Sequence, residues 1–208
     1  MEALLLGLVF LMGMANQPAA APAPPAEVGI YGSLEPCELS VLSPDGVAIY
    51  NHIRKRNPKM PEEYATSIAQ AIDLQSRLAA KEPVDCHLVA AVLSRESSFR
   101  PDVVSTAGAL GIAQMLPGTA ADYGVDNPLD PLQGIQGCVR YLYRSLTFFK
   151  DHEQKERMAV ASYWRGVGGV SRTWPDGKFT EDLEAFVKYI LDLRKALATE
   201  ADEIRESG

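Results

Sequence analysis

The stretch SRESSFRP (residues 94–101) places one carboxylate, Glu96, at the end of an apolar helical segment that Pro101 prevents from continuing far. Eighteen residues after Glu96, Gln114 lies in the Gly-rich apolar stretch GALGIAQMLP (residues 108–117). A carboxyl group enclosed by glycine and apolar side chains prefers its neutral form, so its pKa rises. A carboxylic acid that is neutral near pH 7 is a proton donor, as glycosidic bond cleavage requires. The two stretches therefore make Glu96 a candidate general acid.

The segments around these stretches carry apolar residues at helical spacing. Asp85 is a suitable N-cap for the helix that leads to Glu96. No run of alternating apolar and polar residues indicates a β-strand, and we find no internal repeat. We therefore predict a mainly α-helical (all-α) domain. The predicted helices cover residues 47–56, 61–80, 86–96, 118–123, 131–149, 153–164 and 180–198.

The N-terminal residues 1–15 are predicted to be a signal peptide, because an apolar run precedes the small-x-small sequence Gly13-Met14-Ala15. This region carries Glu2 and no Lys or Arg, which leaves an apolar tail without a targeting role as the alternative. Residues 16–44 are expected to form an Ala/Pro-rich tether and an irregular segment. The helical domain then covers residues 45–198, and residues 199–208 form a polar tail.

The length and net charge of the chain limit the classes of function that it can have. A chain of 208 residues is long enough for one well-packed domain. Its net charge of −7 argues against nucleic acid as a partner, since phosphates reward clustered Lys and Arg. The short basic run at residues 54–56 is interpreted as a solvated helix end.

The cysteines and histidines do not have the spacing of a metal site. Export would permit one disulfide among Cys37, Cys86 and Cys138, with the pairing open. The chain has no Cys-x-x-Cys and no His-Glu-x-x-His motif. We therefore expect no metal and no organic cofactor.

Three motifs in order carry a family resemblance. Glu-Ser-Ser-Phe-x-Pro begins at Glu96, Gly-Ala-Leu-Gly-x-x-Gln-x-x-Pro begins at Gly108, and Ala-x-Ala-Ser-Tyr-x-x-Gly begins at Ala159. Together they resemble the lytic transglycosylases of the soluble-transglycosylase (goose-lysozyme-like) superfamily, over about residues 49–193. The resemblance implies a lysozyme-like fold and cleavage of the β-1,4 bond between N-acetylmuramic acid and N-acetylglucosamine in peptidoglycan. The muramyl C6 hydroxyl would attack its own C1 and leave a 1,6-anhydro ring.

The resemblance also implies roles for individual residues. Glu96 matches the single catalytic acid/base, and Ser105 matches a serine that holds the substrate's N-acetyl group. Gln114 matches a cleft amide that bonds a sugar, and Tyr163 matches a tyrosine near the catalytic carboxyl. Besides Glu96, the expected substrate-binding residues are Ser105, Gln114, Met115, Leu116, Tyr163 and Trp164.

The chain departs from the family pattern at several positions. Trp164 replaces the family's Asn, and it either stacks on a sugar or fills the core. Arg165 either pairs with carboxylates of the substrate's peptide stem or is an ordinary surface arginine. Phe186 stands where the family has Tyr, and Tyr189, one turn further on, is a candidate replacement for the missing hydroxyl.

Plainer roles remain open for the same side chains. Glu96 has the alternative of a surface salt bridge with Arg95 or Arg100. Gln114 is alternatively a brace for its loop, Ser105 a turn or cap residue, and Tyr163 a core residue.

The leading hypothesis is a periplasmic or secreted lytic transglycosylase that acts on peptidoglycan as a monomer. A cell-envelope or secretion-machine partner is a further possibility. A second hypothesis is a hydrolytic muramidase of the same fold, in which Asp102 or Asp122 activates water. A third is a catalytically degenerate module that only binds glycan.

Overall fold

The computed structural model describes residues 32–35 and 37–207, so the predicted signal peptide 1–15 and tether residues 16–31 lie outside the described residues. The described part is helical, with two isolated β-bridges that both involve Leu110 and no β-strand. The predicted mainly α-helical class is therefore confirmed. The helices are η1 (Leu39–Val41), α1 (Pro44–Arg56), α2 (Glu62–Leu78), α3 (Cys86–Ser97), α4 (Pro117–Asp122), α5 (Pro131–Phe148), α6 (Lys155–Arg165), α7 (Val167–Thr173) and α8 (Glu181–Ser207).

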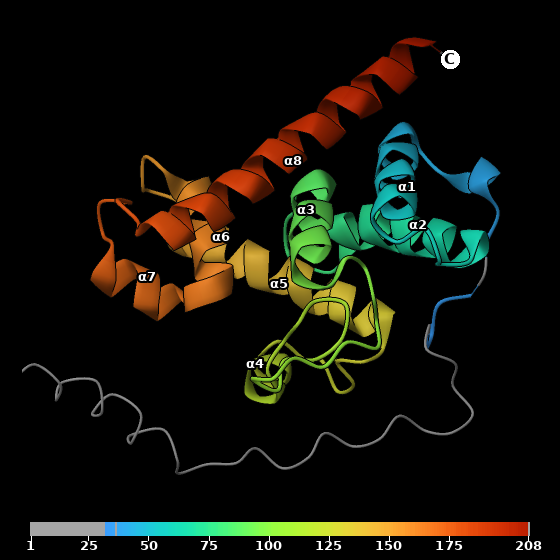
Figure 1. Cartoon of the computed structure of the whole chain (residues 1–208). Helices are drawn as coiled ribbons and strands as arrows, with labels where there is room; N and C mark the ends of the chain where they lie inside the picture. The colour runs from blue at the N-terminus through green and yellow to red at the C-terminus, as the bar shows by residue number, and fades with distance from the viewer. Residues whose placement is uncertain (1–31, 36, 208) are drawn as a thin grey trace, which may run out of the picture.

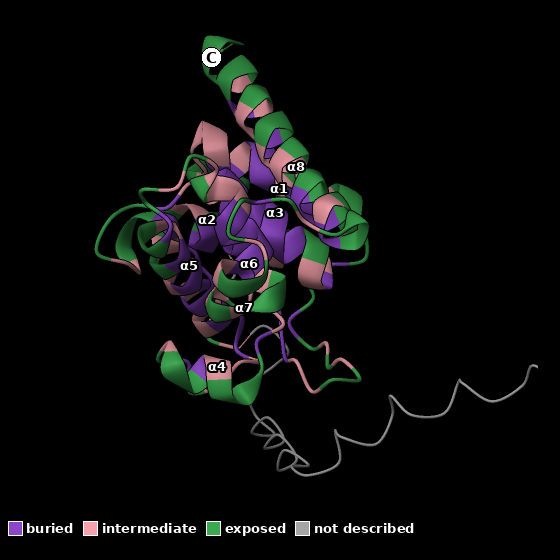
Figure 2. Cartoon of the chain, turned by 90° about the vertical axis from the view of Figure 1, so that its left-hand side faces the viewer, coloured by how far each residue is buried: buried purple, intermediate pink, exposed green. Residues whose placement is uncertain are grey.

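Helix α3 is the central helix of the domain and packs against α1, α2, α5 and α8 (Figure 1). Its residues 88–94 are all buried. In Figure 2 the purple of the buried residues lies in the middle of the molecule. The predicted N-cap is confirmed, because the Asp85 carboxylate accepts hydrogen bonds from the backbone N–H groups of His87 and Leu88. Burial disfavours the Asp85 carboxylate, but hydrogen bonds from His87 and Arg194 hold its pKa well below the usual range.

The predicted helix set differs from the structure at two places in the C-terminal part of the chain. Helix α7 is absent from the prediction, because Gly168 and Gly169 lower its helix propensity. Helix α8 continues past the predicted end at residue 198, so the expected polar tail is helical as far as Ser207. The continuation packs on α1, where Ala201 is fully buried and Asn51 donates a hydrogen bond to Glu200 (2.8 Å).

All three cysteines of the chain lie in the described residues, and each has a free thiol. Cys138 is buried in the core, whereas Cys37 and Cys86 are partly exposed. The disulfide that export would permit is therefore not formed in this structure.

The loop between α3 and α4 begins with strained backbone. Ser98 and Phe99 both have left-handed conformations, with φ of 55° and 62°. Each such residue costs on the order of 1–3 kcal/mol. Complete burial of the Phe99 ring offsets this cost, and the Ser97 hydroxyl donates to the Ile112 carbonyl at 2.7 Å. The end of α3 is thus tied to the Gly-rich stretch.

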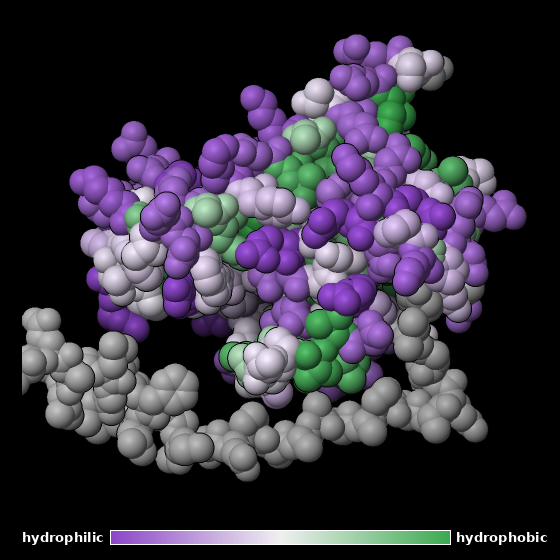
Figure 3. All heavy atoms as spheres, in the orientation of Figure 1, coloured by the Kyte–Doolittle hydropathy of each residue, from purple (hydrophilic) through white to green (hydrophobic). Residues whose placement is uncertain are grey.

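Hydrophilic side chains predominate on the face drawn in Figure 3, which also shows a hydrophobic cluster over the loops beside α4. Val104 and Leu116 are the large hydrophobic side chains of the α3–α4 loop that remain exposed. Within residues 32–35 and 37–207, no helix has the length and apolar character needed to span a membrane.

The chain packs so closely around Gly111 of the α3–α4 loop that any side chain there should destabilise the fold. The φ of Gly111 is 71°, and a Cβ atom there would lie 1.8 Å from the Pro128 carbonyl oxygen. We expect Gly111→Ala to lower the free energy of unfolding by more than about 2 kcal/mol in urea denaturation. Gly118→Ala is the matched control, because a Cβ there meets open space and the change should be within about 1 kcal/mol. Equal stability of the two variants would contradict this account.

Candidate functional site

A cleft of about 530 Å³ gathers the sequence motifs. It is lined by the end of α3, the α3–α4 loop, α4, α5 and the last turn of α6. A larger hollow of about 630 Å³ is lined by one face of α8 alone, so it is open helix surface and not an enclosed site. All of the residues predicted for the site line the cleft, namely Glu96, Ser105, Gln114, Met115, Leu116, Tyr163 and Trp164.

Glu96 lies in the last turn of α3 and is partly buried. Burial raises the pKa of its carboxyl to about 7, and the positive charge of Arg95 opposes this rise. Glu96 has no hydrogen bond or ion pair with any described residue, and Arg100 instead donates to the Ser97 carbonyl. The salt-bridge alternative for Glu96 is therefore not what the structure shows. Near pH 7 the group is poised between acid and base.

Glu96 is the one carboxyl group among the described residues that line the cleft. Asp102 and Asp122, the candidates for a water-activating base, are both exposed and do not line it. The geometry therefore provides a single acid/base without a second carboxylate opposite.

Gln114 is oriented by its own loop. It has a left-handed backbone with φ of 48°, and its Nε2 donates to the carbonyls of Val103 (3.1 Å) and Gly111 (2.9 Å). Its Oε1 has no donor among the described residues. Bracing of the loop and a role in the cleft are thus compatible, because a fixed carboxamide leaves an acceptor for a sugar hydroxyl.

Ser105 closes a tight turn in the same loop. Its N–H donates to the Ala109 carbonyl and its Oγ accepts from the Ala109 N–H, both at 2.9 Å. The hydroxyl hydrogen has no acceptor among the described residues, so Ser105 is a turn residue that still has a donor for a ligand.

Tyr163 joins α6 to the Gly-rich stretch. Its hydroxyl donates to the Ala113 carbonyl at 2.9 Å, and its ring lies edge-on to Tyr141 with centroids 5.1 Å apart. Burial raises the pKa of the phenol well above its ordinary value, and the nearby Cys138 and Glu96 raise it further. Tyr163 is therefore a neutral, fixed wall of the cleft.

Trp164 is 43% exposed, which excludes the interpretation that it fills the core. Its ring rests on Phe186, with centroids 5.2 Å apart, and the Arg165 guanidinium carbon lies 4.6 Å from its ring centroid. Tyr189 is 38% exposed and does not line the cleft, so its hydroxyl does not replace the missing one at Phe186.

Several other residues line the cleft that were not among the predicted site residues. Tyr141 lies within an amphipathic helix, where the pattern indicates only core. Arg165 follows Trp164 in the third motif, so its position was the one available signal. Thr119 lies on α4, and no motif marks it.

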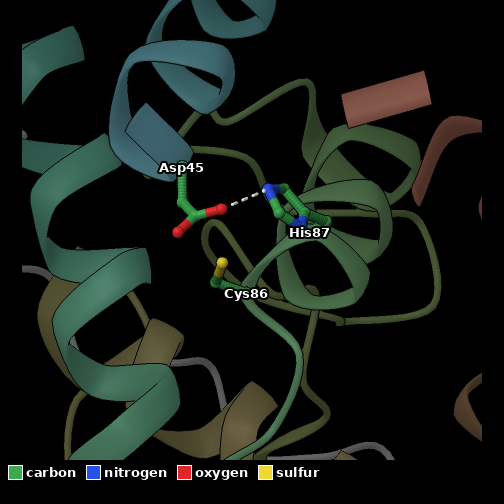
Figure 4. A group of neighbouring side chains, drawn as sticks. All are labelled: Asp45, Cys86 and His87. Carbon is green, nitrogen blue, oxygen red and sulfur yellow. Dashed lines mark ion pairs between the residues drawn. The ribbon is translucent and has the colours of Figure 1, made fainter. Parts of the chain in front are cut away.

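One group of side chains outside the cleft has metal-binding chemistry. Asp45, Cys86 and His87 bring together O, S and N atoms within 4.8 Å of one another (Figure 4). Such donors suit a zinc-like ion. However, Asp45 Oδ1 lies 3.2 Å from His87 Nε2 and also accepts a hydrogen bond from Arg205 (2.5 Å). Burial and the charge of Asp45 raise the pKa of the Cys86 thiol to about 12. These contacts join α1, α3 and α8, and we assign the group no catalytic role.

Three comparisons with known proteins bear on the site. The sequence profile of the family described as "Transglycosylase SLT domain" matches residues 73–184, which is more than half of the chain and includes all three motifs. None of the solved structures matches the chain significantly.

The relatives are longer proteins. Membrane-bound lytic murein transglycosylase F of Pseudomonas syringae pv. syringae (strain B728a) is 34% identical over 124 residues, which cover 56% of this chain and 22% of that protein. The protein called membrane-bound lytic murein transglycosylase F 1 in Alkalilimnicola ehrlichii is 43% identical over 88 residues, 41% of this chain and 18% of that protein. This chain thus spans about a fifth of the length of these relatives. It belongs to the transglycosylase SLT domain family, which has a mainly α-helical, lysozyme-like fold.

Proposed function

We propose that this protein is a peptidoglycan lytic transglycosylase in which Glu96 is the single general acid/base. The observation that carries the proposal is a partly buried carboxyl, with its pKa raised to about 7, and no second carboxylate among the described residues that line its cleft. The family assignment and the names of the relatives support the same reaction class.

The proposed reaction starts with proton transfer. Protonated Glu96 donates to the glycosidic oxygen as the bond between that oxygen and the muramyl C1 breaks. The substrate's own N-acetyl group stabilises the positive charge at C1, which is how glycosidases with one carboxylate dispense with the second. The muramyl C6 hydroxyl then attacks C1 and gives its proton to the Glu96 carboxylate. The 1,6-anhydro ring closes, no water is consumed, and Glu96 returns to its protonated form.

The other cleft residues would bind the substrate. The Ser105 hydroxyl is a free donor for the N-acetyl carbonyl, and Gln114 Oε1 is a free acceptor for a sugar hydroxyl. The exposed part of the Trp164 ring, between Arg165 and Phe186, offers apolar contact to a sugar. Met115 and Leu116 supply an apolar wall, and Tyr163 holds the loop in place.

The two alternatives fit the cleft less well. A muramidase needs a base for water, and neither Asp102 nor Asp122 lines the cleft. A module that only binds glycan has no need of a buried acid. For the place of action we propose the cell envelope, periplasmic or secreted, in line with the predicted signal peptide and with relatives that are named membrane-bound. A monomer and a possible envelope or secretion partner stay predictions.

Products test the reaction directly. Mass spectrometry of muropeptides released from purified peptidoglycan should find 1,6-anhydro ends with the unaltered protein. Glu96→Gln should reduce them by at least about a hundredfold, because it removes the general acid. Glu153→Gln, a change at an exposed glutamate of the α5–α6 loop, should leave the yield unchanged. Reducing ends would indicate the muramidase, and sacculus binding without products would indicate the binding module.

The pH profile tests the protonation state. Because the first step needs the protonated acid, kcat/KM should fall about tenfold per pH unit above about pH 7. Arg95→Gln should move this decline to higher pH, since Arg95 lowers the pKa of Glu96. Arg95→Lys keeps the charge and should leave the decline in place. An unchanged decline in Arg95→Gln would argue against Glu96 as the titrating group.

Folding stability tests the burial of Glu96 without any substrate. The folded pKa of about 7 lies above the ordinary 4.5, so the folded chain holds this proton more tightly than the unfolded chain. The resulting stabilisation is full below about pH 4.5 and is lost as the pH rises through 7. The free energy of unfolding of Glu96→Gln, minus that of the wild type, should therefore rise by up to about 3 kcal/mol from pH 4 to pH 8. Urea denaturation at both pH values measures this rise, and Glu153→Gln should show none.

A further inference from the structure

Four side chains form a continuous stack beside the cleft. The Arg165 guanidinium lies over the Trp164 ring at 4.6 Å, and Trp164 rests on Phe186 at 5.2 Å. Arg95 in turn lies over the Phe186 ring at 5.6 Å. Phe186 is only 6% exposed, so the stack is anchored in the core, while Trp164 and Arg165 reach the cleft. A surface arginine is usually mobile, and this one has a fixed support.

The stacking leaves the hydrogen-bonding groups of Arg165 unused. Contact with the ring involves the face of the guanidinium, whereas its N–H groups point outward in its plane. No described residue forms a hydrogen bond or an ion pair with Arg165. A carboxylate can accept two parallel hydrogen bonds from such a planar fork. A carboxylate is therefore a ligand that fits the free N–H groups of Arg165.

Charge in the cleft favours the same ligand. Arg165 is the one basic residue among the described residues that line it, and Glu96 is the one acidic residue. When Glu96 carries its proton, the cleft is positive in a chain of net charge −7. A neutral glycan gains nothing from this charge, but an anionic group on the glycan does.

We infer that Arg165, supported by Trp164, binds a carboxylate of the peptide stem on the muramyl residue next to Glu96. The identity of the substrate rests on the function proposed above. Arg165 is then a specificity-determining residue, because it favours strands with free stem carboxylates over strands in which these groups are amidated. Amidation removes the negative charge and keeps nearly the same shape, so the two substrates form a matched pair.

Binding measured without turnover tests the inference. In the full chain carrying Glu96→Gln, calorimetric titration with short stem-bearing glycan strands should show about tenfold tighter binding for free than for amidated stems, as for a charge-assisted hydrogen bond. Adding Arg165→Gln should abolish the preference, and Arg165→Lys should keep part of it. Adding Arg172→Gln, which removes an exposed charge on α7 outside the cleft, should preserve it. The preference should also weaken as salt is raised.

Three results would overturn the inference. They are equal binding of free and amidated stems by the parent, an unchanged preference in Arg165→Gln, and an equal loss for both strands in that variant. Arg165 is exposed, and circular dichroism should show that its variants stay folded. Cleavage of peptidoglycan by the unaltered protein is scored separately. Cleavage without a charge preference defeats this inference alone, whereas a preference without cleavage defeats the proposed reaction and leaves the Arg165 site standing.

Discussion

The burial of α3 is the constraint on which the rest of the structure depends. Helices α1, α2, α5 and α8 enclose it, and its residues 88–94 have almost no access to solvent. A helix held in this way can present side chains to solvent only at its ends. Glu96 stands in the last turn, so the packing that stabilises the domain also removes water from its one cleft carboxyl. The raised pKa of Glu96 is therefore a consequence of the core and not of a specific charged neighbour.

The loop after α3 converts that buried acid into a site. Ser98, Phe99 and Gln114 all have left-handed backbones, a conformation that non-glycine residues rarely adopt. The cost of this strain is offset by burial of the Phe99 ring and by hydrogen bonds within the loop, including those of the Gln114 carboxamide. The strained backbone thus lowers the stability of the chain and fixes polar groups around Glu96, as is common where a ligand must find its partners already in place.

Much of this arrangement could be predicted from sequence because the motifs are local. The helix bearing Glu96 begins after Asp85 and ends before Pro101, and Gly108 and Gly111 of the second motif both have a positive φ. Helix α7 escaped prediction because its glycines disfavour a helix that tertiary packing nevertheless imposes.

Other features depend on contacts between distant segments. The continuation of α8 has a polar sequence, and it packs against α1, which lies far from it along the chain. The sequence pattern around Tyr141 indicates a core residue and not a residue of the cleft. The stack under Arg165 includes Phe186, which comes from another helix, α8. The predicted site residues come from local motifs, and the fold brings all of them to one cleft.

Helix α8 has a consequence for how the domain is assembled. Its Arg194 pairs with Asp85, 109 residues earlier, and its Arg205 pairs with Asp45, 160 residues earlier. Contacts over such separations close large loops, and the entropy of loop closure makes them slow to form. Helices α1 and α3 therefore stay uncovered on one flank of the core until α8 has packed against them. The raised pKa of Glu96, which comes from burial, is in turn a property that this carboxyl acquires only in the folded domain.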